Sequence, residues 1–168
     1  MRTRKAFTLV ELVVALVILV VLSSIASLSL TGTMDRYQLT RATQTLEMFD
    51  ARARRDARSS GQAIQTRIDT ARGNLQLASL SENRDGRSQT SQAAFRLPRT
   101  VTIEEIQLVR KMQVGRSFDY VVNPEGRSVS YAVHFQHGNM SRWIVVIGSS
   151  GQTVVAKDKR EANEILSL

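Results

Sequence analysis

Apolar residues follow three different patterns along the chain, and each pattern predicts a different kind of element. The first is an almost continuous apolar run over residues 7–30, FTLVELVVALVILVVLSSIASLSL, in which Glu11 is the single ionisable side chain. A helix of this length can span the roughly 30 Å hydrocarbon core of a bilayer. Because a carboxyl group in such a helix is costly, we expect Glu11 to have a function.

The second pattern covers residues 31–60 and is typical of an amphipathic helix. Thr31-Gly32-Thr33 interrupts the apolar run, and we expect a bend or local unwinding there. Apolar side chains then recur every three or four positions, which predicts one apolar stripe on a continuing helix. The stripe consists of Leu39, Ala42, Leu46, Phe49, Ala53 and Ala57. Gly61 follows as a stop signal.

The third pattern, over residues 61–168, predicts a β-rich domain, because apolar and polar residues alternate between turn-forming segments. Strands are expected at residues 63–68, 75–78, 100–108, 118–122, 129–135, 142–147 and 152–156, with a polar loop at 81–93 and a short helix at 161–166. Turns are expected at residues 72–74, 123–126 and 148–151. The predicted fold class is α+β, with a long N-terminal helix packed on a C-terminal antiparallel β-sheet domain.

Composition limits the possible functions. The 168 residues carry a net charge of +8, which tolerates an anionic partner without requiring one. There is no cysteine, so disulfides and thiolate metal sites are excluded. Aromatic residues make up 5% of the chain, which does not indicate a surface for stacking nucleic-acid bases.

Side chains with catalytic or metal-binding potential form no pattern typical of an active site. His134 and His137 lack a third ligand at a recognisable spacing, so no metal site is expected. Glu104 and Glu105 are neighbours on a predicted strand and should point to opposite faces, which excludes a paired acid and base. Trp143 is expected in the core. We therefore predict a protein that is not an enzyme and needs no cofactor.

Arginines concentrate near the end of the predicted helix. Arg52, Arg54, Arg55 and Arg58 are interleaved with Asp50 and Asp56, which favours a solvated, charged helix face. The alternative is a contact with an anionic partner such as nucleic acid. Four further arginines, Arg84, Arg87, Arg96 and Arg99, flank the polar loop.

The first six residues, MRTRKA, form a short basic leader. Basic residues before an apolar run predict that this end stays in the cytoplasm and that the body is exported. Two processing sites compete. Ser24-Ile25-Ala26 fits an ordinary signal peptidase, which would cut after Ala26. The segment KAFTLVE, residues 5–11, instead resembles the processing motif of type IV prepilins and type II secretion pseudopilins.

This resemblance implies specific roles for three residues. A prepilin peptidase would cut between Ala6 and Phe7, and the new amino group of Phe7 would be methylated. Glu11 would become the fifth residue of the mature chain and pair with the amine of a neighbouring subunit. The family prefers glycine where this chain has Ala6, so slow or incomplete processing would follow from that departure.

A second resemblance covers residues 118–156, where a strand, an Asn-Pro-x-Gly turn and a closing hairpin are similar to the end of GspH/FimT-type minor pseudopilins. It implies a single-pass inner-membrane protein with a periplasmic β domain that assembles with other pilins into a type II secretion pseudopilus or type IV pilus. Three alternatives remain open: a minor pilin that binds DNA for uptake, an unrelated exported binding domain behind an ordinary signal peptide, and a single-span protein that never assembles.

Overall fold

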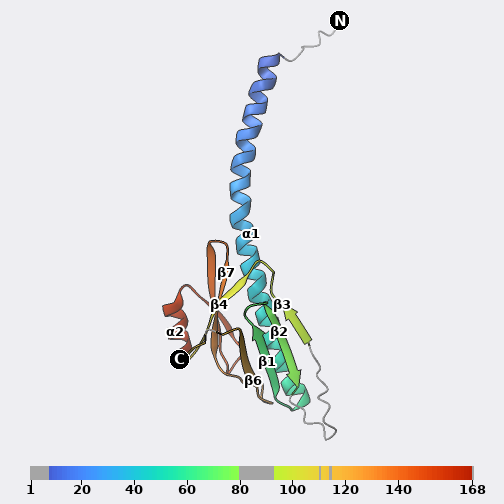
Figure 1. Cartoon of the computed structure of the whole chain (residues 1–168), viewed down its shortest axis with the longest axis vertical. Coiled ribbons are helices and arrows are strands. Elements are labelled where there is room, and N and C mark those ends of the chain that lie inside the picture. Colours follow the sequence, from blue (N-terminus) through green and yellow to red (C-terminus); the bar gives the residue numbers. More distant parts are fainter. Residues whose placement is uncertain (1–7, 80–92, 110, 114, 168) are drawn as a thin grey trace. The chain divides into compact units, whose positions relative to one another are not determined.

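The computed structural model describes residues 8–79, 93–109, 111–113 and 115–167, without the side chains of residues 25–31 and 111–113. The chain forms two compact units, Met1–Arg36 and Tyr37–Leu168. Within the described residues the elements, labelled in Figure 1, are α1 (Leu9–Ser60), β1 (Ile64–Asp69), β2 (Asn74–Ser79), β3 (Ala93–Arg96), β4 (Thr102–Leu108), β5 (Lys111–Gln113), β6 (Ser117–Val122), β7 (Tyr131–His137), β8 (Met140–Val146), β9 (Thr153–Ala156) and α2 (Lys159–Ser167). This is the α+β class that the sequence predicts.

In the first unit, α1 carries exposed apolar side chains. Helical structure continues through residues 31–33, so the predicted local unwinding is wrong. Thr31 and Thr33 flank a single glycine, and one such residue weakens a helix without breaking it. By hydropathy, no helix in the described part of the chain is both long and apolar enough to cross a membrane.

The second unit contains two antiparallel sheets. One has the order β3-β2-β1-β6 and the other has the order β5-β4-β7-β8-β9. Between them lies the main core, to which α1 contributes the apolar stripe predicted from the sequence. All six residues of that stripe are buried, so the predicted helix face is confirmed. Alternating burial along β1 and β6 also matches the predicted period of two.

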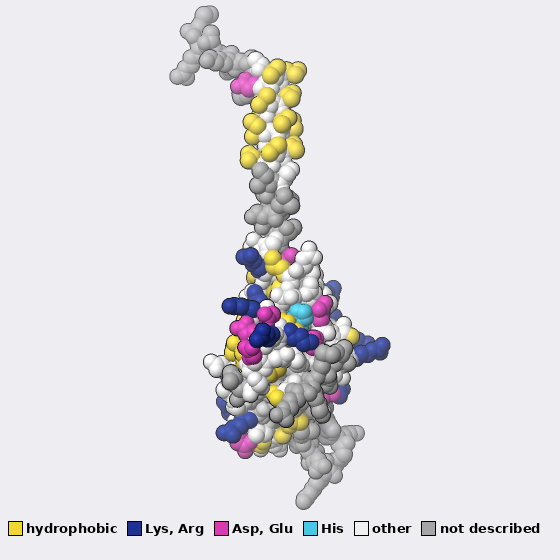
Figure 2. Space-filling model, turned by 90° about the vertical axis from the view of Figure 1, so that its left-hand side faces the viewer, with side chains coloured by type: hydrophobic (Ala, Val, Ile, Leu, Met, Phe, Trp, Pro, Cys, Tyr) yellow, Lys and Arg dark blue, Asp and Glu magenta, His cyan; other side chains and the backbone are white. Residues whose placement is uncertain are grey.

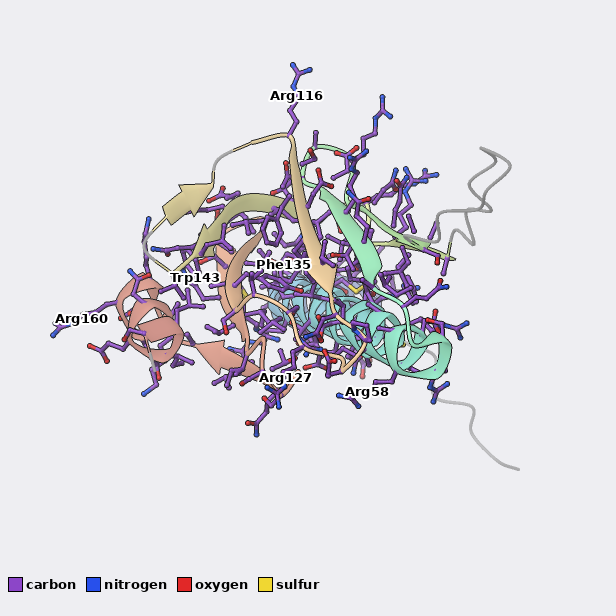
Figure 3. The ribbon with its side chains drawn as sticks, turned by 90° about the horizontal axis from the view of Figure 1, so that it is seen from below. Arg58, Arg116, Arg127, Phe135, Trp143 and Arg160 are labelled. Atoms are coloured by element: carbon purple, nitrogen blue, oxygen red, sulfur yellow. The ribbon has the colours of Figure 1, made fainter. Side chains whose placement is uncertain are left out.

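The larger sheet is covered on its second face by α2. Ala162 and Leu166 of this helix pack with Trp143 and Val145 of β8 in a separate small core. Figure 3 shows one residue from each core: Phe135 of the main core points into the centre of the domain, and Trp143 of the small core lies toward α2. Trp143 is buried, as expected, and the ring of His134 stacks on it at 4.6 Å between ring centroids.

Two short strands, β3 and β5, were not expected. Ala93, assigned to the polar loop, begins β3; the rest of that loop lies outside the described residues. The regular alternation assumed for Glu104 and Glu105 is interrupted, because the register between β4 and β7 shifts between Ile103 and Glu105. This β-bulge keeps both Ile103 and Ile106 in the core. Glu105 forms an ion pair with Lys159 at 2.7 Å, and Glu104 lies 3.4 Å from His134.

Candidate functional site

The first candidate region is the start of α1, where Thr8 caps the helix. Its hydroxyl accepts a hydrogen bond from the backbone N–H of Glu11 at 3.3 Å, and its carbonyl accepts one from Leu12 at 3.2 Å. Thr8 and Glu11 thus occupy the positions of a Thr-x-x-Glu capping box. The Glu11 side chain is exposed, and no described residue pairs with it as a cation. Ala6 and Phe7 lie outside the described residues.

The first part of α1, residues 9–22, exposes every large apolar side chain that it carries. Exposure ranges from 81% at Leu9 to 50% at Val13. The exposed set comprises Leu9, Val10, Leu12, Val13, Val14, Leu16, Val17, Ile18, Leu19, Val20, Val21 and Leu22. Figure 2 shows the hydrophobic side chains of this part of the helix as a yellow column. An apolar surface of this extent indicates a binding partner of apolar character.

The second candidate region is the arginine group near the end of α1, whose four members have different environments. Arg52 is half-exposed and pairs with Asp56 at 2.9 Å. Arg55 is exposed, with no carboxylate partner among the described residues. Arg58 is exposed and donates through Nε to the carbonyl of Glu125 at 3.2 Å. Figure 3 shows Arg58 at the domain surface, pointing outward.

Arg54 differs from these three because only 4% of its surface is exposed. Its Nε donates to Asp50, one helical turn earlier. Its Nη1 donates to the carbonyls of Gly126 and Gly148, at 2.7 and 2.8 Å, and its Nη2 donates to the Ser128 hydroxyl at 3.0 Å. Arg54 is therefore unable to contact an anionic partner. Its inclusion among the arginines predicted as a possible anion contact is wrong.

Asp50 continues this buried network toward the centre of the domain. Its Oδ1 accepts a hydrogen bond from the Tyr120 hydroxyl at 3.2 Å, and the Tyr120 and Tyr131 hydroxyls lie 3.1 Å apart. Burial, followed by the charge of Asp50, raises the pKa of Tyr120. Burial also raises the pKa of Tyr131, with the Tyr120 hydroxyl as the next cause. Both phenols therefore stay protonated well above neutral pH.

The network, which we call the Arg54 clamp, consists of Asp50, Arg54, Tyr120 and Tyr131. It ties α1 to the two predicted turns, at residues 123–126 and 148–151, which lie far away in the sequence. Its polar atoms are paired with one another, with backbone carbonyls or with the Ser128 hydroxyl, as buried polar groups require. The clamp joins α1 to the β domain, so its role is structural. No group of three metal-binding side chains occurs in the described part of the chain.

Sequence reasoning did not find the clamp. One signal was present: Asp50 and Arg54 are four residues apart and lie beside the apolar stripe, where a charged residue needs a partner. The two turns and the two tyrosines could not be assigned to it without the fold. At the start of α1, by contrast, Thr8 and Glu11 are three residues apart in the sequence, so their capping geometry is local.

Comparison with protein families assigns the N-terminal segment. Residues 1–27 match the family described as the prokaryotic N-terminal methylation motif. This match covers the basic leader and most of the apolar run, the segment whose sequence resembles a prepilin processing motif. Comparison with the sequences of curated proteins gives no significant match.

Two solved structures of a minor pseudopilin have a fold similar to that of this chain. A crystal structure of EpsH from the type II secretion system of Vibrio cholerae is 13% identical, with a TM-score of 0.54 over 71% of this chain and 95% of that chain. A second structure of the same pseudopilin is 14% identical, with a TM-score of 0.52 over 71% of this chain and 96% of that chain. At this identity the likeness establishes the fold: a helix followed by antiparallel sheets in the EpsH arrangement.

Proposed function

We propose that this chain is a minor pseudopilin or pilin: a structural subunit, not an enzyme, of a pseudopilus or type IV pilus that serves protein secretion. The observation that carries the proposal is the exposed apolar column of residues 9–22, which lies within the segment that matches the methylation motif. Burying one such side chain is worth about 1.5–3 kcal/mol. A column of them therefore favours strongly any state in which lipid or neighbouring helices cover it.

The proposed maturation follows from the motif. A prepilin peptidase cuts between Ala6 and Phe7, and the amine of Phe7 is methylated. Before cleavage the basic leader lies in the cytoplasm and the β domain in the periplasm, and until assembly the apolar run of residues 7–30 holds the chain in the bacterial inner membrane. Other pilins or pseudopilins then replace lipid around the same helix.

In this proposal Glu11 selects the position of each subunit in the filament. The exposed carboxylate and the amine of Phe7 on a neighbouring subunit are each costly in an apolar environment, and pairing relieves both costs. Capping of α1 is a competing role, since an acidic residue in the first turn also stabilises a helix. The two roles predict different behaviour of the same variants.

The test uses Glu11→Gln, which keeps a capping-box side chain but removes the charge. We expect normal cleavage of this variant, with a loss of at least tenfold in the amount recovered from sheared filaments, measured by immunoblotting. Thr8→Val is the matched control, because it removes the cap and leaves the charge; it should enter filaments. Wild-type recovery of Glu11→Gln would show that charge pairing is not the role of Glu11.

A DNA-uptake role has less support from the arginines near the end of α1. Arg54 is enclosed in the clamp and Arg52 is paired with Asp56. This leaves Arg55 and Arg58 as exposed cations on that face, which is fewer than a tight phosphate track requires. If the chain were an unrelated exported domain behind a signal peptide cut after Ala26, the methylation motif and Glu11 would have no function.

A further inference from the structure

Three arginines from separate segments line one pocket of about 250 Å³ on the second unit. Arg72 lies in the turn between β1 and β2, Arg96 ends β3, and Arg99 follows Pro98 in the link to β4. Thr70, Gly73 and Val101 form other parts of the wall. We call this site the arginine pocket.

Backbone contacts fix the walls of the arginine pocket. The carbonyl of Gly73 accepts a hydrogen bond from Leu97 at 2.9 Å, which joins the β1–β2 turn to the β3–β4 link. Gly73 has a φ of 63°, in the left-handed region that favours glycine. Asp69 supports the same turn, because its Oδ1 accepts hydrogen bonds from the backbone of Ala71 and Arg72. The arginines are thus carried by an ordered frame.

The charge of the pocket is largely uncompensated. No carboxylate among the described residues forms an ion pair with Arg72, Arg96 or Arg99, and all three are exposed. Asp69, in the same turn as Arg72, is engaged with backbone N–H groups. The hydroxyls of Thr70 and Thr102 already donate to the carbonyls of Gly115 and Gln136. Guanidinium groups are therefore the free donors, and they match the oxygens of a phosphate group.

The pocket lies at the same end of the domain as Thr40 of α1. Thr102 pairs with Gln136 beside the β7–β8 hairpin, and His137 in that hairpin lies 2.7 Å from the carbonyl of Thr100. Arg142, in the returning strand, donates to Thr40 at 3.3 Å. Residues 31–39 alone separate Thr40 from the apolar run. This end of the domain is therefore the one that the chain connects to the apolar run.

We propose that the arginine pocket binds the phosphate of an anionic phospholipid in the periplasmic leaflet of the inner membrane, and so holds the domain on the bilayer before the subunit enters a filament. This inference rests on the proposed function, because it requires the membrane anchor. A duplex nucleic acid is disfavoured as the ligand, because the pocket is small and three arginines in one place do not follow a line of phosphates.

The expected effect of the lipid is measurable. A basic residue near an anionic surface contributes about fivefold to binding, so three together contribute roughly 100-fold. Hydrogen–deuterium exchange of the full chain in nanodiscs should be slower at residues 69–73 and 96–102 when phosphatidylglycerol is added to phosphatidylcholine. The variant Arg72→Gln/Arg96→Gln/Arg99→Gln should lose this protection in phosphatidylglycerol.

A control is Arg58→Gln/Arg127→Gln, which removes two exposed arginines that do not line the pocket. This control should keep the protection, and thermal unfolding should be unchanged in both variants because all the replaced side chains are exposed. Equal exchange in the two lipids would overturn the proposal. Protection by inorganic phosphate alone would show a site for the free ion, and protection by duplex DNA in phosphatidylcholine would show a nucleic-acid site; either result would overturn the lipid assignment.

Failure of this inference is distinguishable from failure of the proposed function. If cleavage before Phe7 and recovery in filaments are normal while phosphatidylglycerol has no effect, the subunit role stands and the lipid contact is wrong. If the chain is not cleaved before Phe7, the proposed function itself fails, whatever the lipid effect.

Discussion

Replacing Arg54 by methionine tests the Arg54 clamp, because methionine keeps much of the volume and removes the charge. The variant loses the hydrogen bonds to Gly126, Gly148 and Ser128, and leaves the Asp50 carboxylate buried with the Tyr120 hydroxyl as its remaining partner. Removing one partner of a buried ion pair costs about 3–5 kcal/mol. For a domain of this size, each kcal/mol lowers the melting temperature by about 4 °C.

We therefore expect Arg54→Met to lower the melting temperature by about 12–20 °C, measured by far-UV circular dichroism on the full chain in detergent. Arg55→Met is the matched control on the neighbouring exposed position, and it should change the melting temperature by about 2 °C or less. The double variant Asp50→Leu/Arg54→Met removes both charges and should recover part of the loss, because no unpaired ion remains. A melting temperature of Arg54→Met equal to that of Arg55→Met would refute the clamp.

Two further predictions concern the same region. Gly148→Ala should lower stability by about 2–3 kcal/mol in thermal unfolding, because the added methyl group meets the backbone of Ser128; Gly126→Ala meets the movable Arg58 side chain and should cost about 1 kcal/mol, chiefly for its positive φ. Equal losses would contradict this contrast. Because the folded state raises the pKa of Tyr120 and Tyr131, their contribution to stability is complete below about pH 10, the value of an unfolded tyrosine, and is lost as the pH rises toward the folded pKa. Urea unfolding from pH 8 to 11 should show this fall, and Tyr120→Phe/Tyr131→Phe should flatten it; an unchanged slope would show that the phenols are not responsible.

The sequence was sufficient wherever structure depends on local spacing. The stripe from Leu39 to Ala57 was predictable because six apolar residues repeat at helical spacing. The β1–β2 and β8–β9 hairpins were predictable because apolar strand-forming segments flank glycine-containing turns. The start of α2 also follows a local signal, since Asp158 accepts a hydrogen bond from the backbone of Glu161 at 2.9 Å.

Other features depend on contacts between distant segments. Short strands such as β3 and β5 have too few residues to show a period, and the division into two sheets depends on which strands pair. The bulge at Glu104 changes the facing of its neighbours and has no sequence signature. Burial of Arg54 depends on carbonyls contributed by two turns, so counting arginines along the helix could not separate it from its exposed neighbours.

The central claim is that this chain is a processed filament subunit, and the most direct test is mass spectrometry of its mature N-terminus from native membranes, with and without the prepilin peptidase of the host. The proposed function predicts a chain that begins at methylated Phe7 and requires that peptidase. A chain that begins at Ser27, or that retains Met1, would contradict it.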